Sequence, residues 1–328
     1  MTEKEAKRRS AEHVPVGRFA PSPTGRMHLG NMFTALVSWL SVRSTGGKWI
    51  LRIEDIDPQR SRDEYARLIE DDLDWLGLDF DEGGMSDSGD NGPYRQSLRG
   101  DIYENAMERL KETGLTYPCF CTRSDIMSTQ APHQNDGRII YSGHCRPKHL
   151  PCHTPEPEAK HTVRLFVPDI EFSFEDKVFG RQRVNLATSC GDFVLKRADG
   201  AWAYQLAVVV DDAAMGVTEV VRGNDLLLSV AQQMYLYDLL GLTPPAYAHL
   251  PLICNEAMQR LSKRDSSLNM GELRQRYSAA EIVGMLGYMA NLLPSPAPCR
   301  AEELIPLFDW AKIPAETGRV FKIRDYTI

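Results

Sequence analysis

The spacing of apolar residues near the start of the chain predicts strands that alternate with helices. Residues 16–20 have the length and composition of a short strand, and apolar side chains recur at helical intervals over residues 29–42. Residues 49–53 are again typical of a strand. A strand, a helix and a second strand in this order make a βαβ unit, which requires a parallel sheet. We therefore expect an α/β protein.

Later segments extend this prediction. Residues 61–64 read Ser-Arg-Asp-Glu, the pattern of a capping box at the start of a helix that extends to Trp75. Residues 198–200, Ala-Asp-Gly, predict a hairpin turn between strands at 193–195 and 202–204. The other expected elements are, in chain order, a helix at 94–112, a β-rich stretch at 161–222, a helix at 225–240, a buried strand at 250–254, and helices after residue 271 with proline-rich breaks near 294–298.

Composition narrows the class of protein. The 328 residues are 42% hydrophobic and 25% charged, as in a globular protein that buries a core. No window approaches the ~18 uninterrupted apolar residues of a membrane span, and residues 1–10 are charged, with no apolar stretch behind them. Seven cysteines are an odd count in a chain too long to need disulfide staples. We therefore expect a cytoplasmic protein with no membrane partner.

The net charge of −7 comes from one segment of the chain. Residues 54–90 contain 14 Asp and Glu against 3 Arg, a local charge of −11, so the rest of the chain sums to +4. The ordinary interpretation of such a segment is a solvated acidic surface. It does not exclude an RNA-binding surface elsewhere, because such surfaces are local basic patches.

Two segments carry residues suited to phosphate chemistry. Residues 21–31 read Pro-Ser-Pro-Thr-Gly-Arg-Met-His-Leu-Gly-Asn and lead from the first strand into the first helix. Such a turn directs backbone N–H groups and the positive end of the helix dipole toward a ligand above the sheet. Residues 260–264, Arg-Leu-Ser-Lys-Arg, form a basic loop after a strand. Taken singly, the first segment is most often an ordinary turn with a surface His28, and the second a solvated loop.

Together, about 230 residues apart, the two segments resemble the two signatures of class I aminoacyl-tRNA synthetases. Residues 28–31, His-Leu-Gly-Asn, match the first signature and residues 260–264 match the second. The stretches that indicate the glutamyl branch of this family are 18–25 (Arg-Phe-Ala-Pro-Ser-Pro-Thr-Gly), 51–57 (Leu-Arg-Ile-Glu-Asp-Ile-Asp), 210–212 (Val-Asp-Asp) and 221–226 (Val-Arg-Gly-Asn-Asp-Leu). The resemblance covers residues 17–268 and implies a Rossmann-like catalytic domain on a parallel sheet.

Glutamate recognition can be argued from charge alone. A dicarboxylic amino acid needs a cation for each carboxylate and an anion for its ammonium group. Arg18 and Arg222 are the matching cations and Glu54 is the matching anion, while which arginine holds which carboxylate stays open. Alone, Arg18 would be read as a surface salt bridge worth ~0–1 kcal/mol. With the residues that the resemblance adds, the expected glutamate site comprises Arg18, Phe19, Ala20, Pro21, Ser22, Glu54, Tyr204 and Arg222.

The reaction implied by the resemblance is attack of the glutamate carboxylate on the α-phosphate of ATP, which gives glutamyl-AMP and pyrophosphate. It needs no protein nucleophile, only positioning and stabilisation of charge on the phosphate oxygens. We assign catalysis to His28 and Lys263, and expect Mg²⁺ to accompany ATP. Asn31 stands where the family more often has His, and Arg260 keeps the charge of the usual Lys. The expected ATP site comprises Gly30, Asn31, Arg260, Leu261, Ser262 and Lys263.

A cysteine-rich insert predicts one structural zinc ion. Cys119 and Cys121 form a Cys-x-Cys pair, and Cys145 follows in a stretch with too little apolar content to fold alone. The chemistry of the residues offers His144 or Cys152 as the fourth ligand. The related subfamily instead uses Cys-x-Cys followed by Tyr-x-x-x-Cys, and this resemblance implies Tyr141, giving the set Cys119, Cys121, Tyr141 and Cys145.

The expected organisation is a tail at 1–15, the first half of the catalytic domain at 16–116, the zinc insert at 117–160, the second half at 161–270, and a short helical region at 271–328. Only 64 residues follow Arg264, too few for the helical anticodon-binding region of a glutamyl-tRNA synthetase. The chain therefore resembles truncated paralogues of that branch, which activate glutamate without tRNA and transfer it to queuosine in the anticodon loop of tRNA(Asp).

The expected partners are thus glutamate, ATP and queuosine-containing tRNA(Asp), acting on a monomer. One alternative is a short glutamyl-tRNA synthetase that charges tRNA(Glu). Another is a non-catalytic synthetase-like protein that binds RNA or a partner. The complete set of His28, Lys263, Arg18, Glu54 and Arg222 argues against the second alternative, because a binding module needs no such set.

Overall fold

The computed structural model describes residues 14–128, 140–150, 157–254, 269–320, 322–323 and 326–327. Its centre is a seven-stranded sheet with the strand order β3-β2-β1-β9-β10-β6-β7. All neighbouring pairs are parallel except β6 with β7, which form an antiparallel hairpin. The strands of this sheet are β1 (Val16–Phe19), β2 (Lys48–Leu51), β3 (Glu82–Gly83), β6 (Glu171–Asp176), β7 (Gly180–Asn185), β9 (Glu219–Gly223) and β10 (Ala246–Leu250).

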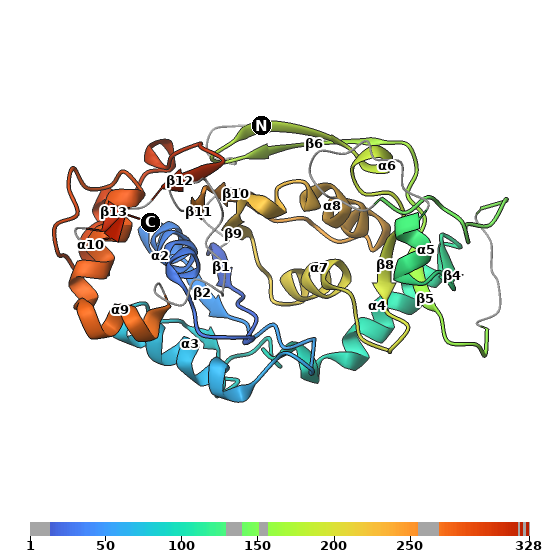
Figure 1. The fold of residues 1–328 in the computed structure, drawn as a ribbon, viewed down its shortest axis with the longest axis horizontal. Coiled ribbons are helices and arrows are strands. Elements are labelled where there is room, and N and C mark those ends of the chain that lie inside the picture. The colour runs from blue at the N-terminus through green and yellow to red at the C-terminus, as the bar shows by residue number, and fades with distance from the viewer. Residues whose placement is uncertain are drawn as a thin grey trace, which may run out of the picture.

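Helices cover both faces of this sheet (Figure 1). Successive residues of a strand point to opposite faces, so Val220 and Tyr247 join one core while Val221 and Ala248 join the other. The helices are α2 (Leu29–Ser44), α3 (Asp63–Leu76), α4 (Gly100–Glu112), α5 (Arg123–Ser128), α6 (Leu186–Ser189), α7 (Tyr204–Ala214), α8 (Ser229–Leu239), α9 (Met270–Arg276), α10 (Ala279–Met289) and α11 (Ala301–Leu304). The expected α/β fold with a Rossmann-like parallel sheet is confirmed.

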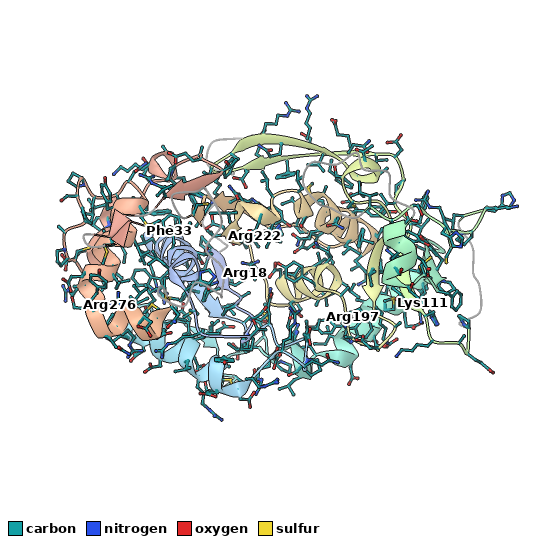
Figure 2. The ribbon with its side chains drawn as sticks, in the orientation of Figure 1. Arg18, Phe33, Lys111, Arg197, Arg222 and Arg276 are labelled. Carbon is teal, nitrogen blue, oxygen red and sulfur yellow. The ribbon has the colours of Figure 1, made fainter. Side chains whose placement is uncertain are left out.

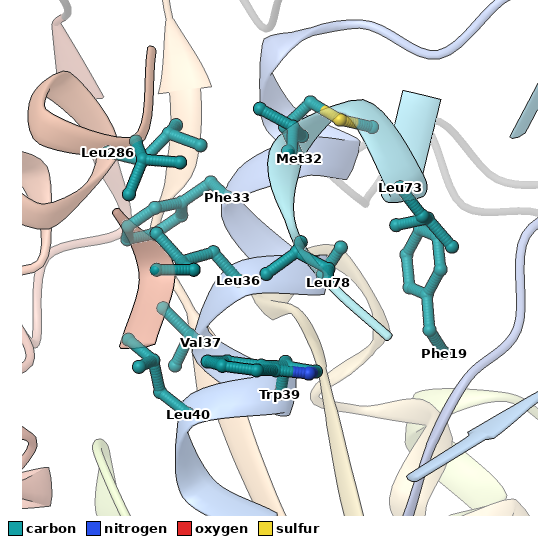
Figure 3. Close-up of a cluster of buried hydrophobic side chains, with 14 of the residues drawn as sticks. Phe19, Met32, Phe33, Leu36, Val37, Trp39, Leu40, Leu73, Leu78 and Leu286 are labelled. Carbon is teal, nitrogen blue, oxygen red and sulfur yellow. The ribbon is translucent and has the colours of Figure 1, made fainter. Parts of the chain in front are cut away.

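Helix α2 is the central element of the first core. Its apolar side chains pack against α3 and α10, and Figure 3 shows Phe33, Leu36 and Trp39 in this cluster with Leu286 of α10. Helix α2 also lies unusually close to β1, because a Cβ at Gly17 would lie 2.4 Å from Cγ2 of Val42. The second core lies under α4, α7 and α8 on the opposite face.

Three small sheets complete the described structure. Strands β4 (Thr116–Cys119), β5 (Thr162–Leu165) and β8 (Phe193–Lys196) form an antiparallel sheet beside the cysteine-rich segment. Strand β11 (Leu252–Cys254) pairs in parallel with β12 (Gly318–Val320), and β13 (Lys322–Ile323) pairs with β14 (Tyr326–Thr327). The end of the chain is therefore not purely helical, as β12 returns to the catalytic half.

Several local predictions need correction. The capping box at 61–64 does not form, because α3 has Arg62 as its N-cap residue, with no side-chain cap hydrogen bond. The predicted helix at 94–112 is interrupted, with a short 3-10 turn at Gln96–Leu98 before α4. The hairpin turn at 198–200 is present, with Trp202 bridged to Lys196, but Tyr204 begins helix α7 instead of continuing a strand. Among the helices of the described residues, none is long and apolar enough to span a membrane.

Candidate active site

A cavity of about 530 Å³ opens at the carboxyl ends of β1, β9 and β10. The chain leaves β1 toward β2 on one side, while β9 and β10 lie on the other, so this is the switch point where open α/β sheets bind ligands. The predicted site residues that line this one cavity are Arg18, Phe19, Ala20, Pro21, Ser22, His28, Gly30, Asn31, Glu54, Tyr204 and Arg222. Figure 2 shows Arg18 and Arg222 near the centre of the molecule, close to this edge of the sheet.

The second signature, residues 260–264, lies outside the described residues, and with it the predicted ATP-site residues Arg260, Leu261, Ser262 and Lys263. The described segments on either side of it both reach the cavity region. Ile253 of β11 lines the cavity. Asn269 forms an antiparallel bridge with His28, and the Met270 N–H donates to the Met27 carbonyl at 2.9 Å. These contacts join the flank of the second signature directly to the first.

The N-terminus of α2 is closed by a reciprocal cap at the cavity wall. Nδ1 of the N-cap residue His28 accepts from the Gly30 N–H at 3.2 Å, and Oδ1 of Asn31 accepts from the His28 N–H at 3.2 Å. In a neutral His28 ring this places the proton on Nε2. A Cβ at Gly30 would lie 3.2 Å from the His28 ring, so glycine leaves room for this cap. Asn31, unusual in the signature, thus has a defined role in holding the helix terminus.

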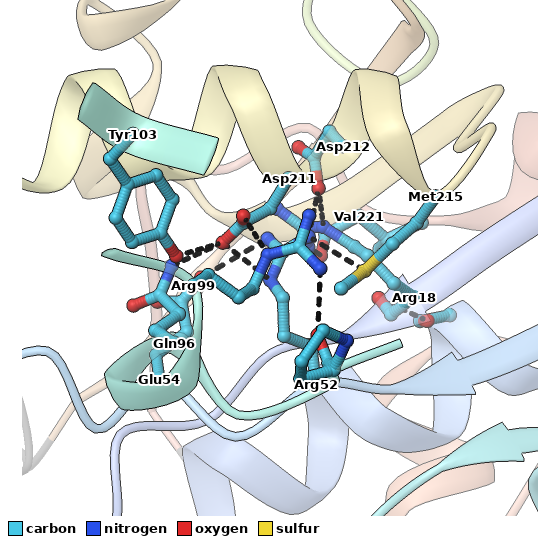
Figure 4. Close-up of polar contacts among 12 residues, drawn as sticks. Arg18, Arg52, Glu54, Gln96, Arg99, Tyr103, Asp211, Asp212, Met215 and Val221 are labelled. Carbon is cyan, nitrogen blue, oxygen red and sulfur yellow. Dashed lines mark hydrogen bonds and ion pairs between the residues drawn. The ribbon is translucent and has the colours of Figure 1, made fainter. Parts of the chain in front are cut away.

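A buried charge network, Arg18, Arg52, Glu54, Asp211 and Asp212, lies behind the cavity (Figure 4). Arg52 is fully buried and contacts Oδ1 of Asp212 at 2.7 Å and Oε1 of Glu54 at 3.1 Å. Nε of Arg18 lies 3.4 Å from the same Asp212 oxygen. The side chains of Arg18, Arg52, Glu54 and Asp212 therefore hold one another in place before any ligand binds.

Burial and neighbouring charges set the protonation of these acids in different directions. Burial raises the pKa of Glu54, and the Arg52 and Arg18 charges only partly offset it. Burial acts in the same direction on Asp212, but Arg52 and Arg18 hold the pKa of that carboxyl below its usual range. Burial also raises the pKa of Tyr204, as does the Glu54 charge. Asp212 is thus the fixed anion of the pair, and Glu54 is the one that a ligand cation would stabilise.

Asp211 anchors the network to the second core. Its carboxylate accepts from Arg99 Nε at 2.6 Å, Gln96 Nε2 at 2.8 Å and the Tyr103 hydroxyl at 2.9 Å. The side chains of Asp211 and Arg99 are at most 1% exposed. A carboxylate with this many donors fixes the α7 end of the network.

Arg222 has the features of a binding group for an anion. Its Nε donates to Nε2 of His249 at 3.0 Å and its Nη2 donates to the Leu226 carbonyl at 3.3 Å. Nη1 is buried and has no hydrogen-bond partner among the described residues. An unpaired buried guanidinium N–H is costly, so a carboxylate in the cavity would supply the missing acceptor.

The predicted site residues did not include five buried polar residues, namely Arg52, Asp211, Asp212, Asp176 and His249. Three of them lie inside the quoted stretches 51–57 and 210–212, so the motifs were recognised in the sequence but no role was assigned to these residues. Asp176 and His249 lie in no such motif. Their positions depend on which strands are neighbours in the sheet.

A second polar group lies in the predicted insert. We call Cys119, Cys121, Cys145 and Tyr141 the cysteine cluster. Its three sulfur atoms lie within 4.8 Å of one another. The Tyr141 hydroxyl oxygen lies 3.4 Å from Sγ of Cys119 and 3.6 Å from Sγ of Cys121, and it accepts from the Cys145 N–H at 2.7 Å.

These distances fit a tetrahedral metal site. Bonds of about 2.3 Å to a central ion separate neighbouring sulfur ligands by about 3.8 Å, and the sulfur atoms of Cys121 and Cys145 are 3.6 Å apart. Among the described residues, the group of mutually close thiol, imidazole and carboxylate ligands contains these three cysteines and no histidine, so His144 is not part of it. Cys152 lies outside the described residues. The six described cysteines are all free thiols.

Comparison with known proteins places these features in a family. The family described as tRNA synthetases class I (E and Q), catalytic domain, matches residues 15–284. A glutamyl-Q tRNA(Asp) synthetase of Nitratidesulfovibrio vulgaris is 46% identical, over 91% of this chain and 93% of the relative. The enzyme of the same name from Symbiobacterium thermophilum is 46% identical over 93% and 95%.

Solved structures agree with this. A glutamate tRNA ligase of Elizabethkingia meningosepticum, crystallised with its amino acid, superposes with a TM-score of 0.81 at 30% identity, covering 94% of this chain and 67% of that one. A methionyl-tRNA synthetase of Mycobacterium tuberculosis shares the fold alone, with a TM-score of 0.52 at 9% identity over 84% and 64%.

Proposed function

Because the chain belongs to the catalytic domains of the class I tRNA synthetases for glutamate and glutamine, we propose that it activates glutamate with ATP, without tRNA, and transfers it to queuosine in the anticodon loop of tRNA(Asp). The relatives named glutamyl-Q tRNA(Asp) synthetase support this acceptor. The observation that carries the proposal is one cavity that combines two arginines, a buried glutamate and the N-terminus of α2.

In the proposed complex the glutamate substrate completes the charges of the cavity. Arg18 and Arg222 bind its two carboxylates, and Arg222 Nη1 gains the acceptor that it lacks. The ammonium group binds Glu54, whose pKa then falls, because a nearby cation favours the carboxylate. The walls of the glutamate site are formed by Tyr204, Ala20, Ser22, Phe19 and Pro21.

Activation joins an oxygen of the substrate α-carboxylate to the α-phosphorus of ATP. The bond from that phosphorus to the β-phosphate bridging oxygen breaks, and pyrophosphate leaves with the electron pair. We assign stabilisation of the phosphate charge to His28, Gly30 and Asn31 at the start of α2, and to Lys263 with Arg260, Leu261 and Ser262. Mg²⁺ would accompany ATP and share this charge.

In the transfer step a hydroxyl of the queuosine cyclopentenediol attacks the carbonyl carbon of glutamyl-AMP. The bond to the phosphate oxygen breaks, AMP leaves, and the hydroxyl proton passes to solvent or to a phosphate oxygen. No protein side chain becomes covalently attached.

The free thiols of the described cysteines suit a reducing, cytosolic setting for this monomeric enzyme.

We also propose that Cys119, Cys121, Tyr141 and Cys145 hold one structural zinc ion in the insert at 117–160. Four protein ligands leave no open position, so the ion would fold the insert and take no part in the reaction. The spacing of the sulfur atoms and the position of the Tyr141 oxygen support this ligand set.

The test begins with ATP–pyrophosphate exchange that depends on glutamate and not on tRNA. Labelled glutamate is then offered to tRNA(Asp) with queuosine, tRNA(Asp) without it, and tRNA(Glu). Transfer only to the first supports the proposal, whereas charging of tRNA(Glu) identifies a short glutamyl-tRNA synthetase. Lys263→Ala should lower the exchange rate about 100- to 1,000-fold with little loss of stability. An unaffected variant would refute the role of Lys263.

A further inference from the structure

Three buried side chains form a hydrogen-bonded row across neighbouring strands of the central sheet. Asp176 ends β6, His249 lies in β10 and Arg222 lies in β9. His249 Nδ1 lies 2.6 Å from Oδ2 of Asp176, and Arg222 Nε lies 3.0 Å from Nε2 of His249. The side chains of Asp176 and His249 are both 0% exposed. The row therefore ends at the arginine that lines the cavity.

The direction of each hydrogen bond is fixed by its ends. A guanidinium can only donate, so Nε2 of His249 must accept and carries no proton. The ring proton then sits on Nδ1 and is donated to Asp176. The other oxygen of Asp176, Oδ1, accepts from the backbone N–H groups of Val178, Phe179 and His249, which leaves Oδ2 for the ring. The carboxylate thus selects the ring tautomer that Arg222 needs.

The charged groups around His249 keep its ring neutral. Burial lowers the pKa of His249, and the Arg222 and Arg18 charges act in the same direction. Asp176 opposes them, yet the pKa stays below its usual range. The Tyr247 ring is stacked on the imidazole, with centroids 6.3 Å apart. A protonated ring would direct a second N–H at the Arg222 N–H.

We propose that Asp176 and His249 are positioning residues that aim Arg222 at a substrate carboxylate. Asp176 fixes the ring proton on Nδ1, the ring accepts from Arg222 Nε, and Arg222 Nη1 is left to face its ligand. Neither residue touches the substrate, and the proposal rests on the proposed binding of glutamate by Arg222. It predicts that the polarity of the row matters, beyond the volume of its side chains.

Asp176→Asn tests this polarity by exchanging one atom. Three backbone N–H groups point at Oδ1, so the amide oxygen stays there and the new NH₂ group faces Nδ1 of His249. The ring must then carry its proton on Nε2, where it opposes the Arg222 N–H. We expect the KM for glutamate in ATP–pyrophosphate exchange to rise about 10- to 100-fold, with much smaller changes in kcat and in the KM for ATP.

Two further measurements separate this effect from general disruption. Nitrogen NMR of the unliganded protein should show the Nδ1–H tautomer of His249 in the parent and the Nε2–H tautomer in Asp176→Asn, with the signal assigned by its loss in His249→Gln. Glu175→Gln, the same acid-to-amide change at an exposed position of β6, should alter neither the tautomer nor KM.

His249 variants supply a test that does not depend on Asp176. The amide oxygen of His249→Gln can still accept from Arg222, so its KM for glutamate should stay well below that of His249→Leu. Equal KM values for these two variants, or an unchanged His249 tautomer in Asp176→Asn, would overturn the proposal. If the parent protein shows no glutamate-dependent exchange, the proposed function fails, while the NMR result still decides whether Asp176 controls the tautomer.

Discussion

The buried charge network and the cysteine cluster both bring polar side chains together away from solvent, and the two regions stabilise these side chains in different ways. In the network, each buried charge meets an opposite charge, as Arg52 does between Glu54 of its own segment and Asp212 of α7. It is supported by two large cores. In the cysteine cluster, three thiols and a phenol face one another, and the small buried core there consists of Tyr117 together with Cys119 and Tyr141 of the cluster itself. The first region pairs its charges within the chain, whereas the second would gain its cohesion from the proposed zinc ion.

The largest effect should come from Asp211→Ala in the network. Removing this carboxylate leaves the Arg99 charge buried without its ion-pair partner, which typically costs about 3–5 kcal/mol. Urea denaturation should show this loss in the free energy of unfolding. Asp238→Ala, at an exposed position of α8, should change it by less than about 0.5 kcal/mol. Equal effects of the two variants would mean that the network does not support the fold.

Removing zinc should destabilise the region of the cysteine cluster and leave glutamate binding at the buried charge network unchanged. At free zinc 100 times its dissociation constant, binding adds about 2.7 kcal/mol to the free energy of unfolding, and chelation should remove this amount. Cys121→Ser should lose the ion, while Cys299→Ser, in the C-terminal region, should retain one zinc per chain by metal analysis. The KM for glutamate should be unchanged in Cys121→Ser. A large change in that KM would show that the two regions are coupled.

Glu54→Gln should affect binding more than stability. The neutral amide cannot pair with an ammonium group, which costs about 1.5–3 kcal/mol, or about 10- to 100-fold in the KM for glutamate. Arg52 keeps Asp212 at 2.7 Å, so the free energy of unfolding should change little. Because burial raises the pKa of Glu54, glutamate binding by the parent should weaken as the pH falls through this raised value.

Two controls follow from this prediction. The dependence on the Glu54 pKa should disappear in Glu54→Gln, and Glu64→Gln, an exposed change in α3, should leave both KM and its pH dependence unaltered. An unchanged KM in Glu54→Gln would place the ammonium group elsewhere.

The smallest effect should come from Asn31→Ala. This change removes the acceptor for the His28 N–H and should lower the free energy of unfolding by about 1 kcal/mol. Asn105→Ala, exposed in α4, removes no cap and serves as the matched control. A rise in the KM for ATP larger than tenfold would assign Asn31 a direct contact with the nucleotide beyond its role in the cap.

The fold and most of the cavity wall could be predicted from the sequence, because both depend on local patterns. The βαβ unit follows from periodicity, and the residues around His28 and Arg222 follow from motifs. The helix that begins at Tyr204 was missed because its Val-Val-Val run favours a strand by intrinsic propensity, although in the structure this run lies buried within α7.

Ion-pair partners were beyond the reach of local patterns. Arg52 meets Asp212 across 160 residues, and His249 meets Asp176 across 73. The first pair is set by how α7 packs beside the end of β2 and the second by the pairing of β10 with β6, and no single stretch of sequence specifies either. The capping box at 61–64 failed for a different reason, since the helix starts one residue later than the motif implies.

The position of β1 in the centre of the sheet has a consequence for synthesis of the chain. The backbone of Val16 bonds to Thr218, 202 residues later, and Gly17 pairs with Glu219. At about 5–20 residues per second, the ribosome needs about 10–40 seconds to deliver that partner. During this interval β1 has an open edge, and the wall of the cavity that carries Arg222 does not yet exist. A chaperone should therefore protect this protein during the period in which only its N-terminal part has been synthesised.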